Sequence, residues 1–291
     1  MEKTDKVDIE LVVEARDGKF GCYITYLFHG ADLGKAIALT LEDVKCLRVR
    51  GARVSSVQYY ERSSGLQEWI RCPVRGLYRL ETIHRWPIQK CDQDFVFPFG
   101  VIAASDQQTF DTDQIREAYL AGGEDGRRFI EVVVDGRRLY PVIRSLIKCL
   151  PAPHIFDIGL LSHWQETGVT EVWRADPSTS GNKISRYLKD NQLDILHNGY
   201  VDFCVRSRDK GYALWLSDHK IVTLFCATAS GIKVMRPHVR HLGFSRRRHL
   251  RSIAEECDHF HYRLPRSLSR DRLTNKLRKD GFAKVKELRD D

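Results

Sequence analysis

Residues 200–226 read YVDFCVRSRDKGYALWLSDHKIVTLFC. They contain three runs rich in β-branched and aromatic residues, at 200–206, 212–216 and 221–226, and short polar segments separate these runs. Extended runs with short polar connections are typical of neighbouring antiparallel strands. The stretch therefore predicts a three-strand meander, and we expect the second half of the fold to be built around it.

Helices and a hairpin are predicted before the meander. Residues 141–150 and 180–190 repeat apolar side chains at helical spacing. The dipeptide DG at 135–136 lies between the runs FIEVVV at 129–134 and RRLY at 137–140, and it predicts a hairpin because Asp-Gly favours a tight type I′ turn. These elements indicate a second α+β unit.

The N-terminal region is predicted to be rich in β-strands. The dipeptide DG at 17–18 separates two apolar runs and predicts a first hairpin over residues 8–28. The short apolar or β-branched runs that follow predict further strands at 36–41, 46–49, 54–60 and 68–72. After this region we expect one helix at 111–120, ended by the glycines at 122 and 123.

The fold class that follows is α+β, with a β-rich antiparallel N-terminal region, a second α+β unit and a short basic helical segment at the C-terminus. A chain of 291 residues is longer than one typical domain core. We expect residues 1–110 to form a scaffold or interaction domain, 125–235 to form the α+β domain that ends in the meander, and 236–291 to bind nucleic acid.

Positive charge is concentrated at the end of the chain. Residues 231–291 contain 17 Lys and Arg against 8 Asp and Glu, whereas residues 1–230 contain 30 against 31. Aromatic residues and histidines lie among the arginines, as in FSRRRH at 244–249 and FHYRLPR at 260–266. A basic block of this composition is typical of a surface that binds phosphate.

Two groups of phosphate contacts are expected in this block, and a helix at 270–279 carries part of the second group. Its Leu273 and Leu277 would face a core. The first group is Arg246, Arg247, Arg248 and Arg251, and the second is Arg263, Arg266, Arg270, Arg272, Lys276 and Lys279.

Two aspartates and a lysine of the meander carry a resemblance. Asp202 is followed sixteen residues later by Asp218, and Lys220 comes two residues after that. Over about 19 residues this spacing resembles the Asp…(Asp/Glu)-x-Lys motif of the PD-(D/E)XK nuclease family. The resemblance implies that Asp202 and Asp218 hold Mg²⁺ or Mn²⁺ and that Lys220 positions the nucleophile. The alternative is a solvated turn between two strands.

A second possible metal site lies among the histidines of the basic block. Imidazole and thiolate are zinc ligands, and the candidates here are His238, His241, Cys257, His259 and His261. Strand-like alternation over 258–262 would place His259 and His261 on one face and the intervening aromatic residues on the other. The alternative is a set of surface histidines that form hydrogen bonds or contact phosphate.

The sequence therefore predicts a protein that binds DNA or RNA through phosphate contacts, as an accessory or assembly subunit with a possible protein partner at its N-terminal region. A metal-dependent nuclease and an assembly subunit with an acidic partner are the alternatives. The charged first residues and the lack of a long apolar run predict a soluble cytoplasmic protein without a membrane partner. Eight cysteines without a CxxC pair favour free thiols in a reducing compartment.

Overall fold

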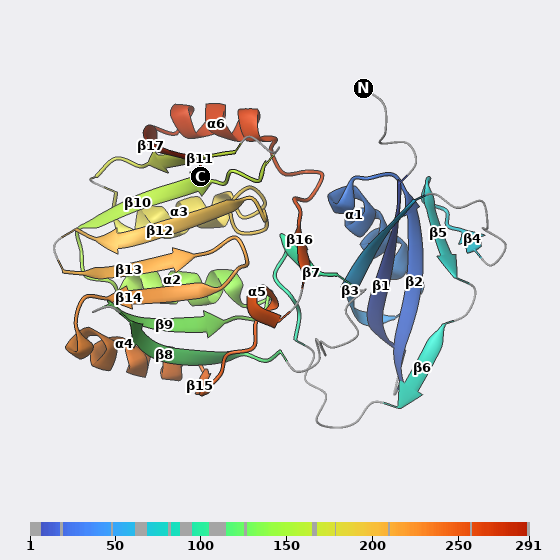
Figure 1. The fold of residues 1–291 in the computed structure, drawn as a ribbon, viewed down its shortest axis with the longest axis horizontal. Coiled ribbons are helices and arrows are strands. Elements are labelled where there is room, and N and C mark those ends of the chain that lie inside the picture. The colour runs from blue at the N-terminus through green and yellow to red at the C-terminus, as the bar shows by residue number, and fades with distance from the viewer. Residues whose placement is uncertain are drawn as a thin grey trace.

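The α+β fold contains two main sheets that lie side by side along the long axis of the molecule in a computed structural model of the chain (Figure 1). The structure describes residues 7–17, 20–47, 49–61, 69–80, 83–87, 95–104, 115–124, 127–164, 168–177, 179–208, 210–256 and 258–289.

The N-terminal sheet is antiparallel and has the strand order β3-β1-β2-β5-β4, with β6 paired to the other end of β2. Its strands are β1 (Val7–Asp17), β2 (Phe20–His29), β3 (Arg50–Glu61), β4 (Trp69–Arg71), β5 (Leu77–Leu80) and β6 (His84–Pro87). The first predicted hairpin is confirmed, because β1 and β2 pair along their whole length.

Helix α1 (Leu33–Val44) packs against this sheet and corrects the predicted strand at 36–41. Its N-cap is Asp32, whose side-chain oxygen accepts a hydrogen bond from the backbone N–H of Lys35 at 2.9 Å. Leu33, Ala36 and Ile37 recur at helical spacing and are buried against the sheet. The predicted strand at 46–49 is also wrong, because a 3₁₀ turn, Lys45–Leu47, continues from the helix.

In the described residues, the second sheet has nine strands in the order β15-β8-β9-β14-β13-β12-β10-β11-β17. The bounds are β8 (Ala118–Glu124), β9 (Arg127–Val133), β10 (His154–Leu160), β11 (Val169–Arg174), β12 (Val201–Ser207), β13 (Tyr212–Leu216), β14 (Val222–Cys226), β15 (Ser245–Arg246) and β17 (Ala283–Arg289). Strands β12, β13 and β14 form the predicted antiparallel meander at its centre. Apart from the parallel pair of β15 and β8, its neighbours are antiparallel.

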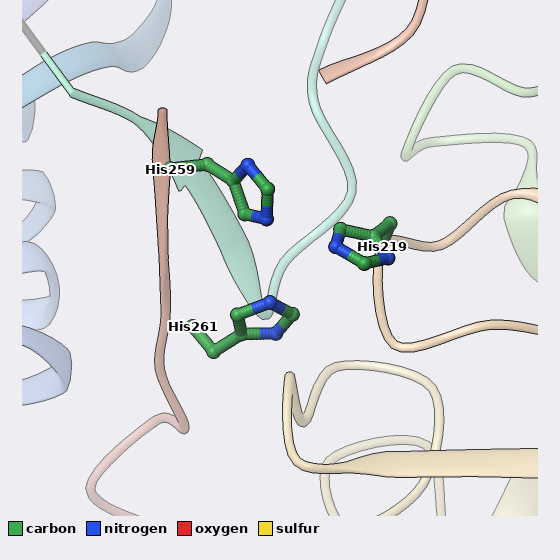
Figure 2. Close-up of side chains that lie close together, drawn as sticks. All are labelled: His219, His259 and His261. Atoms are coloured by element: carbon green, nitrogen blue, oxygen red, sulfur yellow. The ribbon is translucent and has the colours of Figure 1, made fainter. Parts of the chain in front are cut away.

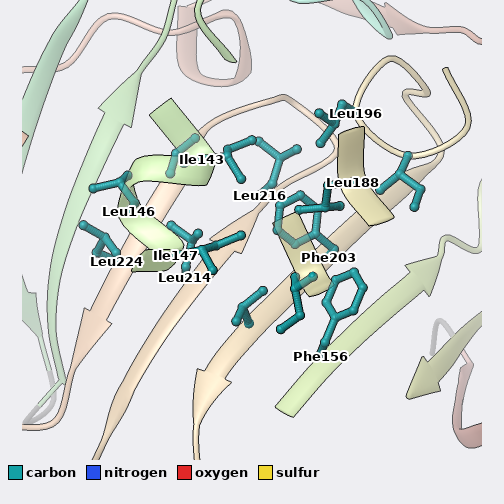
Figure 3. Packing of buried hydrophobic residues seen from close by; sticks show 14 of the residues in the cluster. Ile143, Leu146, Ile147, Phe156, Leu188, Leu196, Phe203, Leu214, Leu216 and Leu224 are labelled. Atoms are coloured by element: carbon teal, nitrogen blue, oxygen red, sulfur yellow. The ribbon is translucent and has the colours of Figure 1, made fainter. Parts of the chain in front are cut away.

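One face of the second sheet carries the larger core. Alternate residues of β12 point into it, so that Phe203 is buried while Asp202 lies on the opposite face. Phe203 and Leu214 pack with Ile147 and Leu188 from the helices behind the sheet (Figure 3). These helices are α2 (Leu139–Cys149), α3 (Gly181–Asp190), α4 (Ala229–His241) and, near the β17 edge, α6 (Arg270–Lys279). The predicted helices at 141–150 and 180–190 are thereby confirmed.

Two predicted elements before α2 are wrong. The predicted helix at 111–120 falls partly outside the described residues, and its described end lies in β8. The glycine at 122 does not cap a helix, because it lies within β8. A Cβ at this position would stand 2.6 Å from the ring of Phe129. Residues 137–140 are not a strand either, because Asp135 accepts the backbone N–H of Arg137 at 2.9 Å and the chain turns into α2.

The C-terminal part of the chain contributes to both halves of the molecule. The predicted helix at 270–279 is confirmed as α6, and Leu273 and Leu277 are fully buried. Strand β17 pairs with β11 at the edge of the second sheet. Between the two main sheets, β16 (His259–His261) pairs with β7 (Val101–Ala103), next to the short helix α5 (Ile253–Glu256) (Figure 1).

Arg270 holds the start of α6 to the loop between β10 and β11. Its guanidinium donates to the carbonyl oxygens of Leu161 at 2.8 Å, Trp164 at 3.1 Å and Val169 at 2.8 Å. The residue is only 6% exposed. Its planar fork of donors suits three carbonyls that one ammonium group would not match.

Within the described ranges, every helix is too short or too polar to cross a bilayer.

Replacement of Arg270 by Lys is expected to lower the free energy of unfolding by about 2 kcal/mol, because buried carbonyls lose their donors. Urea unfolding followed by circular dichroism measures the change. Arg272→Lys is the matched control, since Arg272 is exposed two residues further on, and it should change stability by less than about 0.5 kcal/mol. Equal stability of the two variants would contradict the structural role of Arg270.

Candidate functional site

Histidines converge at the junction between the two sheets. In β16, Phe260 and Tyr262 pack into the N-terminal core, as the alternation predicted from the sequence requires. His259 and His261 point the other way, toward His219 in the turn between β13 and β14 (Figure 2). The ring centroid of His219 lies 4.7 Å from that of His259 and 5.0 Å from that of His261.

Close backbone packing places β16 beside the meander. Tyr262 donates its N–H to the carbonyl of Gly100 at 2.9 Å and accepts the N–H of Gly199 at 2.9 Å. A Cβ on residue 199 would stand 1.9 Å from the carbonyl oxygen of Gly100, so this approach requires glycine. Tyr200 then donates its hydroxyl to the carbonyl of His261 at 2.8 Å. His261 is therefore fixed at both its backbone and its ring.

The hydrogen bond to the ring of His261 determines its tautomer. Nδ1 of His261 lies 2.7 Å from the carbonyl oxygen of Gly199. A carbonyl only accepts, so Nδ1 carries the proton and Nε2 keeps its lone pair. Burial lowers the pKa of His261 to about 4, although the charge of Asp218 opposes the shift. At neutral pH the lone pair on Nε2 is thus available inside the cluster.

Asp218 orients His219 in the same way. Oδ1 of Asp218 lies 2.9 Å from Nδ1 of His219, which leaves Nε2 of His219 as the acceptor nitrogen. Burial alone would raise the pKa of Asp218, but the hydrogen bond from His219 and the charges of His219, His261 and Lys220 outweigh it and lower the pKa to about 2. The carboxylate is ionised at neutral pH. Its Oδ2 lies 3.8 Å from Nε2 of His261 and 3.9 Å from Nε2 of His163.

Among the described residues, two overlapping sets of side chains in the cluster lie close enough together to be candidate metal ligands. Within each set the ligand atoms lie within 4.8 Å of one another. The sets are His219, His259 and His261, and His163, Asp218 and His261. Beside them, His261 also lines a cleft of about 380 Å³ whose wall includes the stacked rings of Trp164 and Tyr200. The cluster can hold a divalent ion next to an open cleft.

Of the three nuclease candidates, only Asp218 belongs to this cluster. Lys220 is fully buried, and its ammonium donates to the carbonyls of Asn198 at 2.6 Å and Val201 at 3.1 Å. Burial lowers the pKa of Lys220 to about 8. Its donors already serve the backbone, so Lys220 is engaged in holding the loop before β12.

Asp202 lies on the sheet face opposite the main core. Its Oδ2 accepts the indole N–H of Trp215 at 2.9 Å, and burial raises its pKa. A Cβ on residue 159 would lie only 2.0 Å from Oδ1 of Asp202. Asp202 belongs to neither metal-ligand set found among the described residues. The geometry therefore does not bring Asp202 and Asp218 together with a third ligand.

The zinc candidates predicted from the sequence divide in the same manner. His259 and His261 join the cluster, whereas His238 and His241 are exposed on α4. Cys257 lies outside the described residues. Sequence reasoning missed His163 and His219. The signal for His219 was only the neighbouring aspartate in the SDHK turn, His163 in the LSHW segment had no such neighbour, and no spacing links either residue to β16.

The first group of predicted phosphate contacts lies at the β15 edge of the second sheet. Arg246, Arg247, Arg248 and Arg251 are exposed. Arg246 shares a hollow of about 530 Å³ with Arg236 and Arg240, which stand one turn apart on α4. Arg247, Arg248 and Arg251 follow Arg246 closely in the chain and are exposed. We use the name basic edge for Arg236, Arg240, Arg246, Arg247, Arg248 and Arg251.

The second group lies around α6, near the opposite edge of the sheet (Figure 1). Eight steps of about 4.8 Å between neighbouring strands give roughly 38 Å between the two edges. Arg266, Arg272 and Lys279 are exposed, whereas Lys276 pairs with Asp280 at 3.0 Å. Arg263 donates to the carbonyl of Ser267 at 3.1 Å, and the buried Arg270 is engaged as described above. The two groups do not form one surface.

No protein-family model, no curated protein and no solved structure matches the chain.

Replacement of Lys220 by Met is expected to destabilise the protein by about 3 kcal/mol at pH 7, because two buried carbonyls lose their charged donor. The loss should also depend on pH. The folded-state pKa of about 8 lies below the ordinary value of 10.5, so between these pH values the unfolded chain binds the extra proton. The free energy of unfolding rises with pH in such a window. The difference in this free energy between the wild type and Lys220→Met should therefore increase from pH 8 to 10.5 and decrease again as the pH is lowered.

Urea unfolding of both proteins across this range measures the difference. Lys279→Met is the matched control, because Lys279 is exposed on α6 and its loss should change stability by less than about 0.5 kcal/mol at every pH. A Lys220→Met protein as stable as the wild type would contradict the role of the buried ammonium.

Proposed function

We propose that the protein binds nucleic acid through the basic edge, and that it acts as an accessory or assembly subunit. The observation that carries the proposal is the convergence of Arg236, Arg240 and Arg246 on one hollow, with three further exposed arginines beside it. Each comes from the C-terminal part of the chain, where the excess of positive charge lies.

Arginine side chains suit this role for a chemical reason. A guanidinium presents a planar fork of donors that matches two phosphate oxygens, and it remains charged at any working pH. Nε of Arg236 is buried and has no hydrogen-bond partner in the described part of the chain, so an acceptor in the hollow would satisfy it. Contacts of this kind position a backbone without reading bases, so DNA and RNA are both candidates.

The α6 group supports the proposal less strongly. It lies about 38 Å from the basic edge by the strand spacing, and only part of it is exposed. One short nucleic-acid segment would not touch both groups. We therefore assign the primary contact to the basic edge and leave Arg266, Arg272 and Lys279 as the members of the second group that face solvent.

A metal-dependent nuclease is the second candidate, and the observation that favours it is the ionised Asp218 among histidines beside a cleft. Lys220, whose ammonium is hydrogen-bonded to two carbonyls, does not support the role that the family resemblance implied for it. The third candidate is an assembly subunit whose basic edge meets an acidic protein, because charge attracts any polyanion. A protein partner at the N-terminal sheet remains part of the proposal.

Combined replacement of Arg246, Arg247 and Arg248 by Ala is expected to weaken binding to all sequences alike. Each phosphate contact on duplex DNA contributes about 0.9 to the slope of log affinity against log salt, and about 0.7 on single strands. The slope should therefore fall by about 2 to 3 units. Fluorescence anisotropy with labelled DNA and RNA at several salt concentrations, with and without magnesium, measures slope and affinity and reports any cleavage.

The matched control is Arg266→Ala, Arg272→Ala and Lys279→Ala in one protein, which removes the same charge at the other edge. It should keep the slope within about 1 unit of the parent. An unchanged slope and affinity in the first variant would show that its arginines are only a solvated face. A parent protein that binds no nucleic acid near physiological salt would favour the acidic protein partner instead.

A further inference from the structure

The histidine cluster offers a donor set that the nucleic-acid proposal does not use. Three imidazoles, from His219, His259 and His261, bring their ligand nitrogens within 4.8 Å of one another. Imidazole nitrogen suits zinc and its neighbours in the transition series, whereas Mg²⁺ prefers oxygen ligands. The chemistry of these side chains therefore selects a different ion from the one that a two-carboxylate nuclease site would hold.

The spacing of the nitrogens fits such an ion after a small adjustment. Ligands about 2.05 Å from a tetrahedral zinc lie about 3.3 Å from one another. Nitrogens at most 4.8 Å apart reach that spacing when each side chain moves by roughly 1 Å.

The surroundings of the rings provide an independent observation. Histidine ligands of metals usually donate their other ring N–H to a carboxylate or a backbone carbonyl, which fixes the tautomer and the ring orientation. Nδ1 of His219 lies 2.9 Å from Oδ1 of Asp218, and Nδ1 of His261 lies 2.7 Å from the carbonyl oxygen of Gly199. Both rings are thus contacted through Nδ1 by an oxygen acceptor, and Figure 2 shows the three rings close together.

We propose that His219, His259 and His261 bind a zinc-class divalent ion, with Asp218 and the carbonyl of Gly199 orienting two of the three rings. The ion would join β16 to the turn between β13 and β14, and so would link the two halves of the molecule at their junction. With three protein ligands, the fourth position of a tetrahedral ion is left for water, for His163 or for a group in the neighbouring cleft. The proposal is independent of nucleic-acid binding.

The test uses the full chain, stripped with a chelator and titrated with Zn²⁺ in competition with an indicator, without nucleic acid. One zinc per chain is expected, and the midpoint of thermal unfolding should rise by about 5 °C or more at saturation. His219→Ala and His259→Ala should each weaken zinc binding by at least about 100-fold, and Asp218→Asn by about 10- to 100-fold because it removes only an orienting acceptor. Magnesium at millimolar concentration should leave the midpoint unchanged.

The matched control is the double variant His238→Ala and His241→Ala, which removes two exposed histidines of α4 and should bind zinc as the wild type does. Circular dichroism verifies the fold of each variant, and the Co²⁺-substituted wild type provides a readout that needs no variant, since a tetrahedral site gives strong visible absorption. Zinc binding that survives in both His219→Ala and His259→Ala, or that is lost only in the α4 control, would overturn the proposal. A wild type that neither binds zinc nor gains thermal stability from it would overturn it as well.

Discussion

The buried ammonium of Lys220 is the interaction on which the junction depends. It ties the carbonyls of Asn198 and Val201 to the turn between β13 and β14. A buried cation costs free energy unless its donors are satisfied, so the loop before β12 can take only a conformation that offers carbonyls to this group. That conformation presents Gly199 to the backbone of β16 and to the ring of His261. Lys220 thus helps to position both the start of β12 and the backbone that contacts the ring of His261.

The same turn explains why sequence reasoning reached part of the site and missed the rest. Alternation in β16 predicts that His259 and His261 share a face, because the period of a strand is local. The motif that joined Asp218 to Lys220 does not predict that the two side chains lie in different surroundings. Lys220 has a φ of +64°, and its ammonium is buried against the carbonyls of Asn198 and Val201, whereas Asp218 lies with the histidines. Spacing along the chain carries no information about the left-handed backbone at Lys220.

The fold was predicted best where one face of a strand or helix is buried and worst where glycine or a cap decided the structure. The meander, α2, α3 and α6 all show regular apolar spacing. Helix α1 was mistaken for a strand because its apolar stripe is short and its cap, Asp32, is the main signal of its start. The charge of the C-terminal block was visible in the sequence, but its division between two sheet edges follows from strand order, which pairs residues far apart in the chain.

Strand β17 has a consequence for the behaviour of the molecule in concentrated solution. All seven of its residues are exposed, and it ends the second sheet with backbone groups that another chain could pair with. Lysines at 284 and 286 and an arginine at 289 lie along it. A second copy paired antiparallel about Lys286 would set two lysines directly opposite each other, and like charges in that position repel. Edge-to-edge pairing of two molecules in this register is therefore disfavoured.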